Sequence, residues 1–325
     1  AIATPADINA LFSNPAKMAF LDRDYGFAVS FTPWLKALVN DIYMAGLAGY
    51  YKVKDKQTIQ LGVKYFSLGS ITFTDYNGQE IGQFKPNEFS IDAGYTRKLG
   101  DNFALSATLR FIYSNLTNVA ADGVPTYPGY AGAADLSWFY TKQFGKGKSK
   151  DDLLVGMNIS NIGSKISYTH NSKNSDYIPT NLGIGVGYTL NVDEKNAIGF
   201  YMDVNRLLVP TPQPATIPSV YAGDSASTVA NPNYDANTDG VADWKQKSPI
   251  GGIFTSFNDA PGIMYKDESG NITRIKGSRF REEMRENNVG VGVEYMYNKQ
   301  FGVRFGYFYE QLSTGNRQLD RKSVV

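Results

Sequence analysis

The chain contains long stretches in which large apolar side chains alternate, residue by residue, with small or polar ones. In the first, Phe103, Leu105 and Leu109 share one face, and Ser106 and Thr108 share the other. The same period recurs in three further stretches: 182–190, 289–297 and 301–309. Successive side chains of a strand point to opposite faces, so this pattern predicts strands with one apolar and one polar face. Such segments are typical of a transmembrane β-barrel, although a soluble β-sandwich gives the same alternation.

The lengths of the connections separate these two folds. We predict eleven strands, at 25–33, 42–54, 57–76, 79–98, 102–116, 128–144, 152–169, 178–190, 196–208, 287–298 and 301–312. Short polar turns such as 54–56 and 191–195 alternate with connections that are mostly longer, such as 117–127 and 209–286. Outer-membrane barrels have short periplasmic turns and longer extracellular loops, whereas a sandwich has no reason to sort its loops. We therefore predict an all-β fold, a transmembrane antiparallel β-barrel that crosses the outer membrane many times and forms a single domain over 1–325.

Eleven strands put the start of the first strand and the end of the last strand on opposite sides of the membrane. Bacterial barrels, in contrast, have an even number of strands and both termini in the periplasm. The tail 319–325 has no alternation that could supply a twelfth strand, and residues 1–4 show no signal peptide. An open sheet would leave unpaired backbone groups in lipid. We therefore expect the complete protein to contain further strands.

The segment 1–24 precedes the first strand and has a different pattern. Residues 7–19 are moderately helical, and Asn14-Pro15-Ala16 fits a turn that leads into a short helix. We expect this segment to lie at the periplasmic mouth or to plug the lumen; a simple periplasmic tail is the alternative.

Composition excludes several functions. Lys and Arg number 32 and Asp and Glu number 31, which argues against a nucleic-acid partner. Cysteine is absent, so disulfides, thiolate metal sites and cysteine nucleophiles are excluded. His170 is the single histidine, it lies in a polar loop, and no Gly-x-Ser-x-Gly motif accompanies it. We therefore expect a solvated loop histidine and no enzyme activity.

Three stretches go beyond a generic barrel: 25–41, 65–78 and 298–310. Together with Asn14-Pro15-Ala16 they resemble the PorV (LptO-like) family of outer-membrane proteins of the type IX secretion system, within the wider FadL-like barrels. The resemblance implies fourteen strands, of which about eleven are present here. It also implies a role that is not enzymatic. Such barrels accept cargo proteins from a SprA-type translocon by the cargo's C-terminal domain, and they deliver the cargo to a PorU-like attachment complex.

A second function remains open, because the wider family also contains transporters of hydrophobic small molecules. Such a FadL-type transporter needs a continuous passage past the N-terminal segment, whereas a cargo shuttle does not.

The connection 209–286 is far longer than an ordinary loop, and long loops are usually functional or disordered. Its first half is rich in Pro, Ser, Asn and Asp, which suggests disorder, while its second half carries apolar residues. These residues either pack over the barrel mouth or form a patch that docks a protein partner. The candidate partner-binding residues are Phe254, Phe257, Ile263, Met264, Tyr265 and, in the first extracellular loop, Trp34. An aromatic belt at the membrane interface is the default interpretation of Trp34, and a lateral contact with a translocon is the alternative.

Two charged segments of this connection are also candidates. Asp235, Asn237, Asp239 and Asp243 match the start of a calcium loop, but Gln246 stands where an EF-hand has a bidentate Glu, so we expect at most weak calcium binding. A polar loop produces such a run by chance as well. The mixed-charge run 279–286 fits a solvated helical turn, and the alternative is contact of its arginines with phosphates of lipopolysaccharide.

Overall fold

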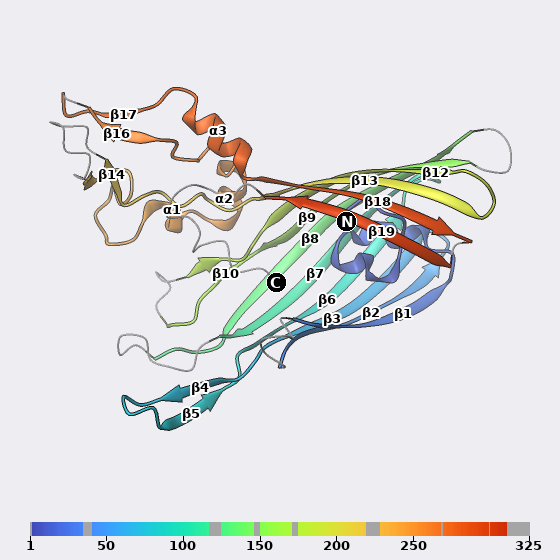
Figure 1. The fold of residues 1–325 in the computed structure, drawn as a ribbon, viewed down its shortest axis with the longest axis horizontal. Helices are drawn as coiled ribbons and strands as arrows, with labels where there is room; N and C mark the ends of the chain where they lie inside the picture. The colour runs from blue at the N-terminus through green and yellow to red at the C-terminus, as the bar shows by residue number, and fades with distance from the viewer. Residues whose placement is uncertain are drawn as a thin grey trace. The chain divides into compact units, whose positions relative to one another are not determined.

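An eleven-stranded antiparallel sheet dominates the computed structural model, which describes residues 2–34, 41–116, 125–145, 150–170, 175–218, 228–267, 269–298 and 300–310 (Figure 1). Its strands are β1 (Tyr25–Pro33), β2 (Ile42–Lys54), β3 (Gln57–Leu68), β6 (Asn87–Lys98), β7 (Phe103–Asn115), β8 (Gly129–Phe144), β9 (Asp151–Gly163), β12 (Asn181–Asn191), β13 (Asn196–Leu207), β18 (Asn287–Tyr297) and β19 (Phe301–Tyr309). They lie in the order in which they occur in the chain, from β1 at one edge to β19 at the other. This meander confirms the predicted all-β fold, and the bounds of β1 and β2 coincide with the prediction.

Three predicted strands were too long, and local backbone chemistry explains where each one ends. The strand predicted at 57–76 ends at Gly69, which has a positive φ of 86° that glycine adopts readily. The strand predicted at 79–98 is interrupted at Pro86, which has no N–H for a ladder. The pieces left over, β4 (Ile71–Thr74) and β5 (Glu80–Phe84), pair with each other in a separate hairpin. The strand predicted at 152–169 ends at Gly163, and β10 (Lys165–Ile166) pairs with β11 (Asp176–Tyr177).

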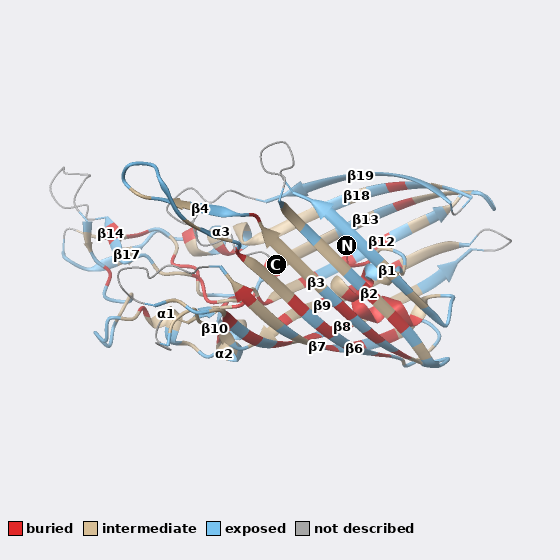
Figure 2. Ribbon diagram, turned by 90° about the horizontal axis from the view of Figure 1, so that it is seen from below, coloured by how far each residue is buried: buried red, intermediate tan, exposed pale blue. Residues whose placement is uncertain are grey.

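Buried and exposed residues alternate along strands of the sheet (Figure 2), and the two faces have the polarity of a membrane protein. In β7, Thr108 is 1% exposed whereas its neighbour Leu109 is 70% exposed. The same contrast holds in β3, where Gln60 is buried and Leu61 is exposed. A soluble protein buries its apolar side chains and exposes its polar ones, so a sheet that does the reverse has lipid rather than water outside it. This observation decides against the soluble sandwich.

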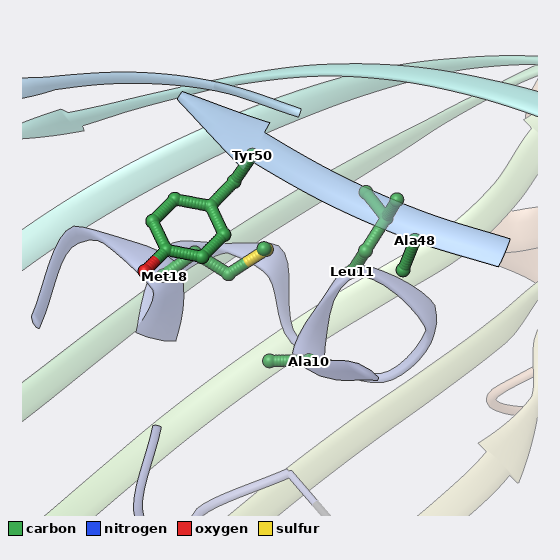
Figure 3. Packing of buried hydrophobic residues seen from close by; sticks show 5 residues of the cluster. All are labelled: Ala10, Leu11, Met18, Ala48 and Tyr50. Atoms are coloured by element: carbon green, nitrogen blue, oxygen red, sulfur yellow. The ribbon is translucent and has the colours of Figure 1, made fainter. Parts of the chain in front are cut away.

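The N-terminal segment forms two 3-10 helices, η1 (Ile8–Phe12) and η2 (Pro15–Phe20), as expected for a helical segment before the first strand. Leu11 of η1 and Met18 of η2 pack on Ala48 and Tyr50 of β2 in a buried apolar cluster (Figure 3). We call the face of the sheet that contacts these helices the covered face. The segment is therefore packed on the sheet, and the alternative of a simple tail is excluded.

The described part of the connection between β13 and β18 has structure of its own, including short elements in the first half, for which disorder was expected; residues 219–227 of that half lie outside the described residues. Its elements are β14 (Thr216–Pro218), β15 (Thr228–Ala230), α1 (Asp243–Gln246), α2 (Pro249–Thr255), β16 (Met264–Lys266), β17 (Ile272–Arg274) and α3 (Ser278–Arg285). β14 pairs with β15 and β16 with β17. None of the helices in the described ranges has the length and hydropathy needed to cross a bilayer.

The chain divides into two compact units. The first comprises Ala1–Ile178, Gly183–Asp203 and Gly290–Tyr307, and the second comprises Pro179–Leu182, Val204–Val289 and Phe308–Val325. The prediction of a single barrel domain over 1–325 is not tested by this division and stays a prediction. The tail 319–325 lies outside the described residues.

Candidate functional site

Asn14 fastens the N-terminal segment to the covered face. Its side chain is fully buried, and its Nδ2 donates to the carbonyl oxygens of Ile2 at 3.2 Å and Trp138 at 3.1 Å. Its Oδ1 accepts from the N–H of Ala16 at 3.2 Å and so caps η2 at its N-terminus. Pro15 follows at the first helical position, where the missing N–H costs nothing. The motif singled out in the sequence therefore sets both the start of η2 and its attachment to β8.

Polar side chains of three further strands also form hydrogen bonds with the N-terminal segment. The carbonyl oxygen of Pro15 accepts from Nε2 of Gln60 at 3.2 Å and from Oγ1 of Thr96 at 3.1 Å. Nδ2 of Asn158 donates to the carbonyl oxygen of Ser13 at 2.8 Å. These partners come from strands β3, β6 and β9, so the segment is bound across much of the sheet.

Lys17 is buried within this arrangement, at 1% exposure, and its Nζ donates to Oγ1 of Thr4 at 3.0 Å. Burial lowers the pKa of the Lys17 amine below its usual value, and the carboxylates of Asp7 and Asp203 oppose that shift. Strand β12 leaves room for the chain here, because a Cβ at Gly187 would overlap the carbonyl oxygen of Ala3.

A buried ionic network crosses the covered face. The Nε of Arg110 pairs with Asp92, and its Nη2 lies 3.0 Å from Oδ2 of Asp135. Its Nη1 donates to Oδ1 of Asn161 at 2.5 Å, and the backbone N–H of Asn161 donates to Asp135 at 2.7 Å. Asn161 has a φ of 59° beside the bulge in β8–β9 pairing, so the irregular backbone brings its amide to the cluster. In this polar part of the covered face, hydrogen bonds and ion pairs therefore join the neighbouring strands β6, β7, β8 and β9.

In the second unit, Arg206 near the end of β13 joins the two helices α2 and α3. Its Nη2 donates to the carbonyl oxygen of Ser256 at 2.6 Å, and its Nη1 donates to the carbonyl oxygen of Glu283 at 2.9 Å. The guanidinium also pairs with the carboxylate of Glu283 and, at 3.2 Å, with that of Glu286. Glu283 in turn accepts from the N–H of Ala260 at 2.8 Å. One buried cation therefore fixes the end of α2, the segment after it and α3.

Exposed apolar side chains lie on α2, directly after it, and on α3. Phe254 of α2 and Phe280 of α3 are 75% and 69% exposed, and each has an apolar residue four positions away on its own helix. We call this surface the apolar platform; it consists of Ile250, Phe254, Phe257, Phe280 and Met284. Phe257 also stands over Arg206, with the guanidinium carbon 5.4 Å from the ring centroid. Of these five side chains, that of Phe257 therefore packs against the buried cation.

The structure places the predicted partner-binding residues unequally. Phe254, Phe257 and Ile263 are exposed, Tyr265 is partly exposed, and Met264 is buried at 6% exposure. Met264 lies in the β16–β17 hairpin, and its sulfur lies 4.0 Å from Nη2 of Arg274. Ile250 and Phe280 belong to the apolar residues that the sequence shows in this half of the connection, but they were not among the named candidates. Met284 was missed, although its spacing of four residues from Phe280 was a usable signal.

Trp34 directly follows β1 and is 55% exposed. Its backbone N–H donates to the carbonyl oxygen of Ile42 at 2.9 Å. This position fits both the aromatic belt and a lateral contact, which stay predictions. Residues 35–40 of the same loop lie outside the described residues.

The predicted calcium loop is a compact turn in which carboxylate side chains accept hydrogen bonds from backbone N–H groups of the same loop. Asp235 accepts from the N–H groups of Asp239 at 3.2 Å and Gly240 at 2.8 Å, and Asp243 accepts from Ala236 at 3.3 Å. Asn237 donates to Gln246 at 3.3 Å. Within the described ranges, no three carboxylate or imidazole side chains converge as a metal cluster. Calcium binding here stays a prediction.

Comparison with known proteins identifies the family. The family model described as "Type IX secretion system protein PorV" matches residues 1–214. The chain belongs to the PorV family. It is accordingly an outer-membrane β-barrel protein of the type IX secretion system, and the resemblance noted in the sequence is confirmed.

Other comparisons give distant likenesses only. No curated protein matches the chain. Among solved structures, a deletion mutant of the monoaromatic hydrocarbon channel TodX has 10% identity and a TM-score of 0.46, covering 98% of this chain and 82% of that one. The toluene transporter TodX of Pseudomonas putida has 12% identity and a TM-score of 0.42, covering 96% and 81%. The monoaromatic hydrocarbon channel CymD has 10% identity and a TM-score of 0.40, covering 97% and 81%. At these scores the likenesses carry no argument about function.

Membership of the PorV family makes the chain part of a secretion machine. Two side chains of the types that catalyse reactions in other proteins, His170 and Tyr168, lie in the loop between β10 and β11. The ring of His170 lies tilted against the ring of Tyr127, with ring centroids 4.2 Å apart. Tyr168 shares a hydrogen bond of 2.8 Å with Oγ of Ser114, and burial raises the pKa of its phenol. This Tyr–Ser pair is a structural contact between the loop and β7.

Proposed function

We propose that this PorV-family barrel acts without chemistry of its own, as a shuttle that accepts cargo proteins and hands them on. It takes the C-terminal domain of a cargo from a SprA-type translocon and delivers the cargo to a PorU-like attachment complex at the cell surface. Lipid and lipopolysaccharide surround it. The connection 209–286 is extracellular in this proposal, and it carries the docking surface.

The observation that carries the proposal is the apolar platform. Phe254, Phe280 and Met284 are each more than half exposed in a connection that lies between two strands. Single exposed apolar residues are common on protein surfaces, but clusters of large ones mark interaction sites. Full burial of one such side chain contributes about 1.5–3 kcal/mol, so burial of three supports a specific but reversible complex.

The contacts that hold α2 and α3 in place favour docking of a partner on the apolar platform over packing of the platform against the protein's own surface. Arg206 and Glu283 hold α2 and α3 through buried charged hydrogen bonds, which are stronger than neutral ones. A surface whose backbone is already fixed loses little entropy when a partner binds. The platform is therefore preorganised for a protein partner.

The covered face supports a shuttle over a transporter. The N-terminal segment is hydrogen-bonded to three strands through Ser13 and Pro15, and the Arg110 network lies on the same face. A hydrophobic solute on that face would meet buried charges and would have to break these contacts. The alternative of a FadL-type transporter has no comparable support.

Binding measurements on platform variants test the proposal. The full chain in detergent is mixed with the isolated C-terminal domain of a type IX cargo, and affinity is measured for the wild type and for a Phe254→Ser/Phe257→Ser/Phe280→Ser variant. We expect at least a tenfold loss of affinity. Ile81→Ser is the matched control, because Ile81 is 69% exposed in the β4–β5 hairpin, and it should bind as the wild type does. Equal affinity of all three proteins would refute the platform as the docking surface.

A further inference from the structure

The connection between β9 and β12 folds back onto the covered face of the sheet. Its described residues after β9 include 164–170 and 175–178, which we call the inward loop. Ile166 and Ile178 are 9% and 5% exposed, and they form a buried apolar cluster with Ala131 of β8. The inward loop therefore packs against the sheet and does not extend into solvent.

Gly129, the first residue of β8, makes room for this loop. A Cβ on Gly129 would lie 2.7 Å from Cγ1 of Ile166 and 3.1 Å from Cε1 of Tyr168. Non-bonded carbon atoms pack at about 3.5–4.0 Å, so a larger residue would push the loop away from β8. The backbone N–H of Tyr127 also donates to the carbonyl oxygen of Tyr168 at 2.9 Å. The sequence of β8 is therefore fitted to a loop that lies on its covered face.

A chain of hydrogen bonds joins the inward loop to two further strands. The hydroxyl of Tyr168 lies 2.8 Å from Oγ of Ser114 in β7, and this Oγ donates to Oε1 of Glu88 in β6 at 2.5 Å. A serine hydroxyl has one proton, so Tyr168 donates to Ser114 and Ser114 donates to Glu88. Ser114 is 1% exposed, which places the chain away from water. Together with the apolar cluster on β8, these bonds hold the loop on three neighbouring strands.

The inward loop, the ionic network of the covered face and the N-terminal segment follow one another along the same strands. In β6, Glu88 accepts the last bond of the chain from the loop, Asp92 belongs to the network, and Thr96 binds the N-terminal segment. Eight residues at ~3.4 Å each separate Glu88 from Thr96, a distance of about 27 Å along the strand. In β8, Gly129 lies under the loop and Asp135 belongs to the network, in the same order. The network therefore lies between two covers.

We propose that the inward loop is a strap that shields the ionic network of Arg110 from the extracellular side. The connection that contains the loop is extracellular in the predicted topology, and the N-terminal segment covers the network from the opposite end. A solute that enters from outside along β6, β7 and β8 meets the loop before it meets the charges. The inference does not rest on the proposed function, because it concerns the covered face and not the apolar platform.

Exclusion of water gives the strap a physical role. The side chain of Arg110 is 11% exposed, and those of Asp92 and Asp135 are 0% and 3% exposed. Ion pairs are stronger in a medium of low dielectric constant, and water and salt weaken them. A loop that keeps water and ions away therefore preserves the ion pairs that join β6, β7 and β8.

The absence of cysteine from the chain allows a single thiol to test the strap. Ser90→Cys places the thiol on β6 between Glu88 and Asp92, at a position that is 5% exposed. The complete protein in detergent is treated with a small cationic methanethiosulfonate, and the rate of labelling is measured. We expect labelling to be at least tenfold faster when residues 165–177 are replaced by Gly-Ser-Gly. Equal rates with and without the loop, whether fast or slow, would overturn the inference.

Tyr76→Cys is the matched control for the reagent. Tyr76 is fully exposed beside the β4–β5 hairpin, so its thiol should be labelled at the same fast rate with and without the inward loop. A change in that rate would assign the effect to the reagent or to a change elsewhere in the protein, and would overturn the inference.

A smaller change tests the same contacts without shortening the loop. Ile166→Ser/Tyr168→Phe removes an apolar contact on β8 and the hydroxyl that donates to Ser114, so the thiol at position 90 should be labelled several-fold faster. Tyr130→Phe is its control, because Tyr130 lies in β8 beside the loop but is 58% exposed on the apolar face, and its labelling rate should match that of the parent. If the Gly-Ser-Gly protein lacks the heat-resistant folded form, this double variant decides, and an unchanged rate overturns the assignment.

Discussion

Leu109→Arg tests whether lipid covers the apolar face of the sheet. Leu109 is the middle residue of β7 (Phe103–Asn115) and is 70% exposed, while Thr108 beside it is 1% exposed. If lipid covers this face, the substitution places a guanidinium near the centre of the bilayer. Arginine there destabilises a membrane barrel by about 2–4 kcal/mol.

This cost corresponds to a large change in the folding equilibrium. With a factor of ten for each ~1.36 kcal/mol, the ratio of folded to unfolded protein falls about 30- to 900-fold. On a water-covered surface, a substitution away from special features changes stability by only about 0.5 kcal/mol or less. The expected loss of stability is therefore several times larger on a lipid-covered face than on a water-covered one.

Ile81→Arg provides the matched control. Ile81 is 69% exposed, almost the same as Leu109, but it lies in the β4–β5 hairpin, which is separate from the large sheet. Urea unfolding of the full chain in lipid vesicles, followed by the loss of the heat-resistant band, measures both variants. We expect a loss of about 2–4 kcal/mol for Leu109→Arg and a change within about 0.5 kcal/mol for Ile81→Arg. Equal stability of the two variants would refute the assignment of the faces.

Three further predictions concern the N-terminal segment, the platform base and the calcium loop. Asn14→Ala removes the cap of η2 and two further hydrogen bonds, so it should cost about 1–2 kcal/mol and expose the N-terminal segment to protease; unchanged protection would contradict the role of Asn14. Arg206→Met leaves Glu283 buried without its cation, so protease should cut 250–290 faster while the strands remain protected, and an unchanged digestion pattern would count against Arg206 as the joint. Gln246→Glu supplies a carboxylate at the twelfth position of the loop that starts at Asp235, so it should tighten calcium binding in calorimetry; no heat from either protein would rule out the site.

The sequence was sufficient for the order of the eleven sheet strands and for their faces, but not for the ends of three of them. Alternation with a period of two is local, so Leu105 and Ser106 could be assigned to opposite faces from their neighbours alone. The Asn14-Pro15-Ala16 motif likewise predicted the start of a helix, because capping acts within a few residues. The strand breaks at Gly69 and Pro86 are also local signals, because a glycine and a proline mark them in the sequence, but the prediction carried the strands through both positions.

The contacts of the candidate sites could not be predicted in this way. Arg206 meets Ser256 and Glu283, which lie 50 and 77 residues further along the chain, and no pattern in the sequence connects them. The Arg110 network needs the register of β6, β7 and β8 and the bulge at Asn161. Met264 was a candidate docking residue from its sequence position, yet its side chain is buried at 6% exposure.

Secretion by cells that carry platform variants tests the central claim most directly. Phe254, Phe257 and Phe280 are replaced together by Ser in the complete protein, and two quantities are measured: the amount of heat-resistant barrel in the outer membrane, and the release of type IX cargo at the cell surface. The proposed function predicts normal assembly of the barrel and loss of cargo release. Normal assembly with normal release would contradict it.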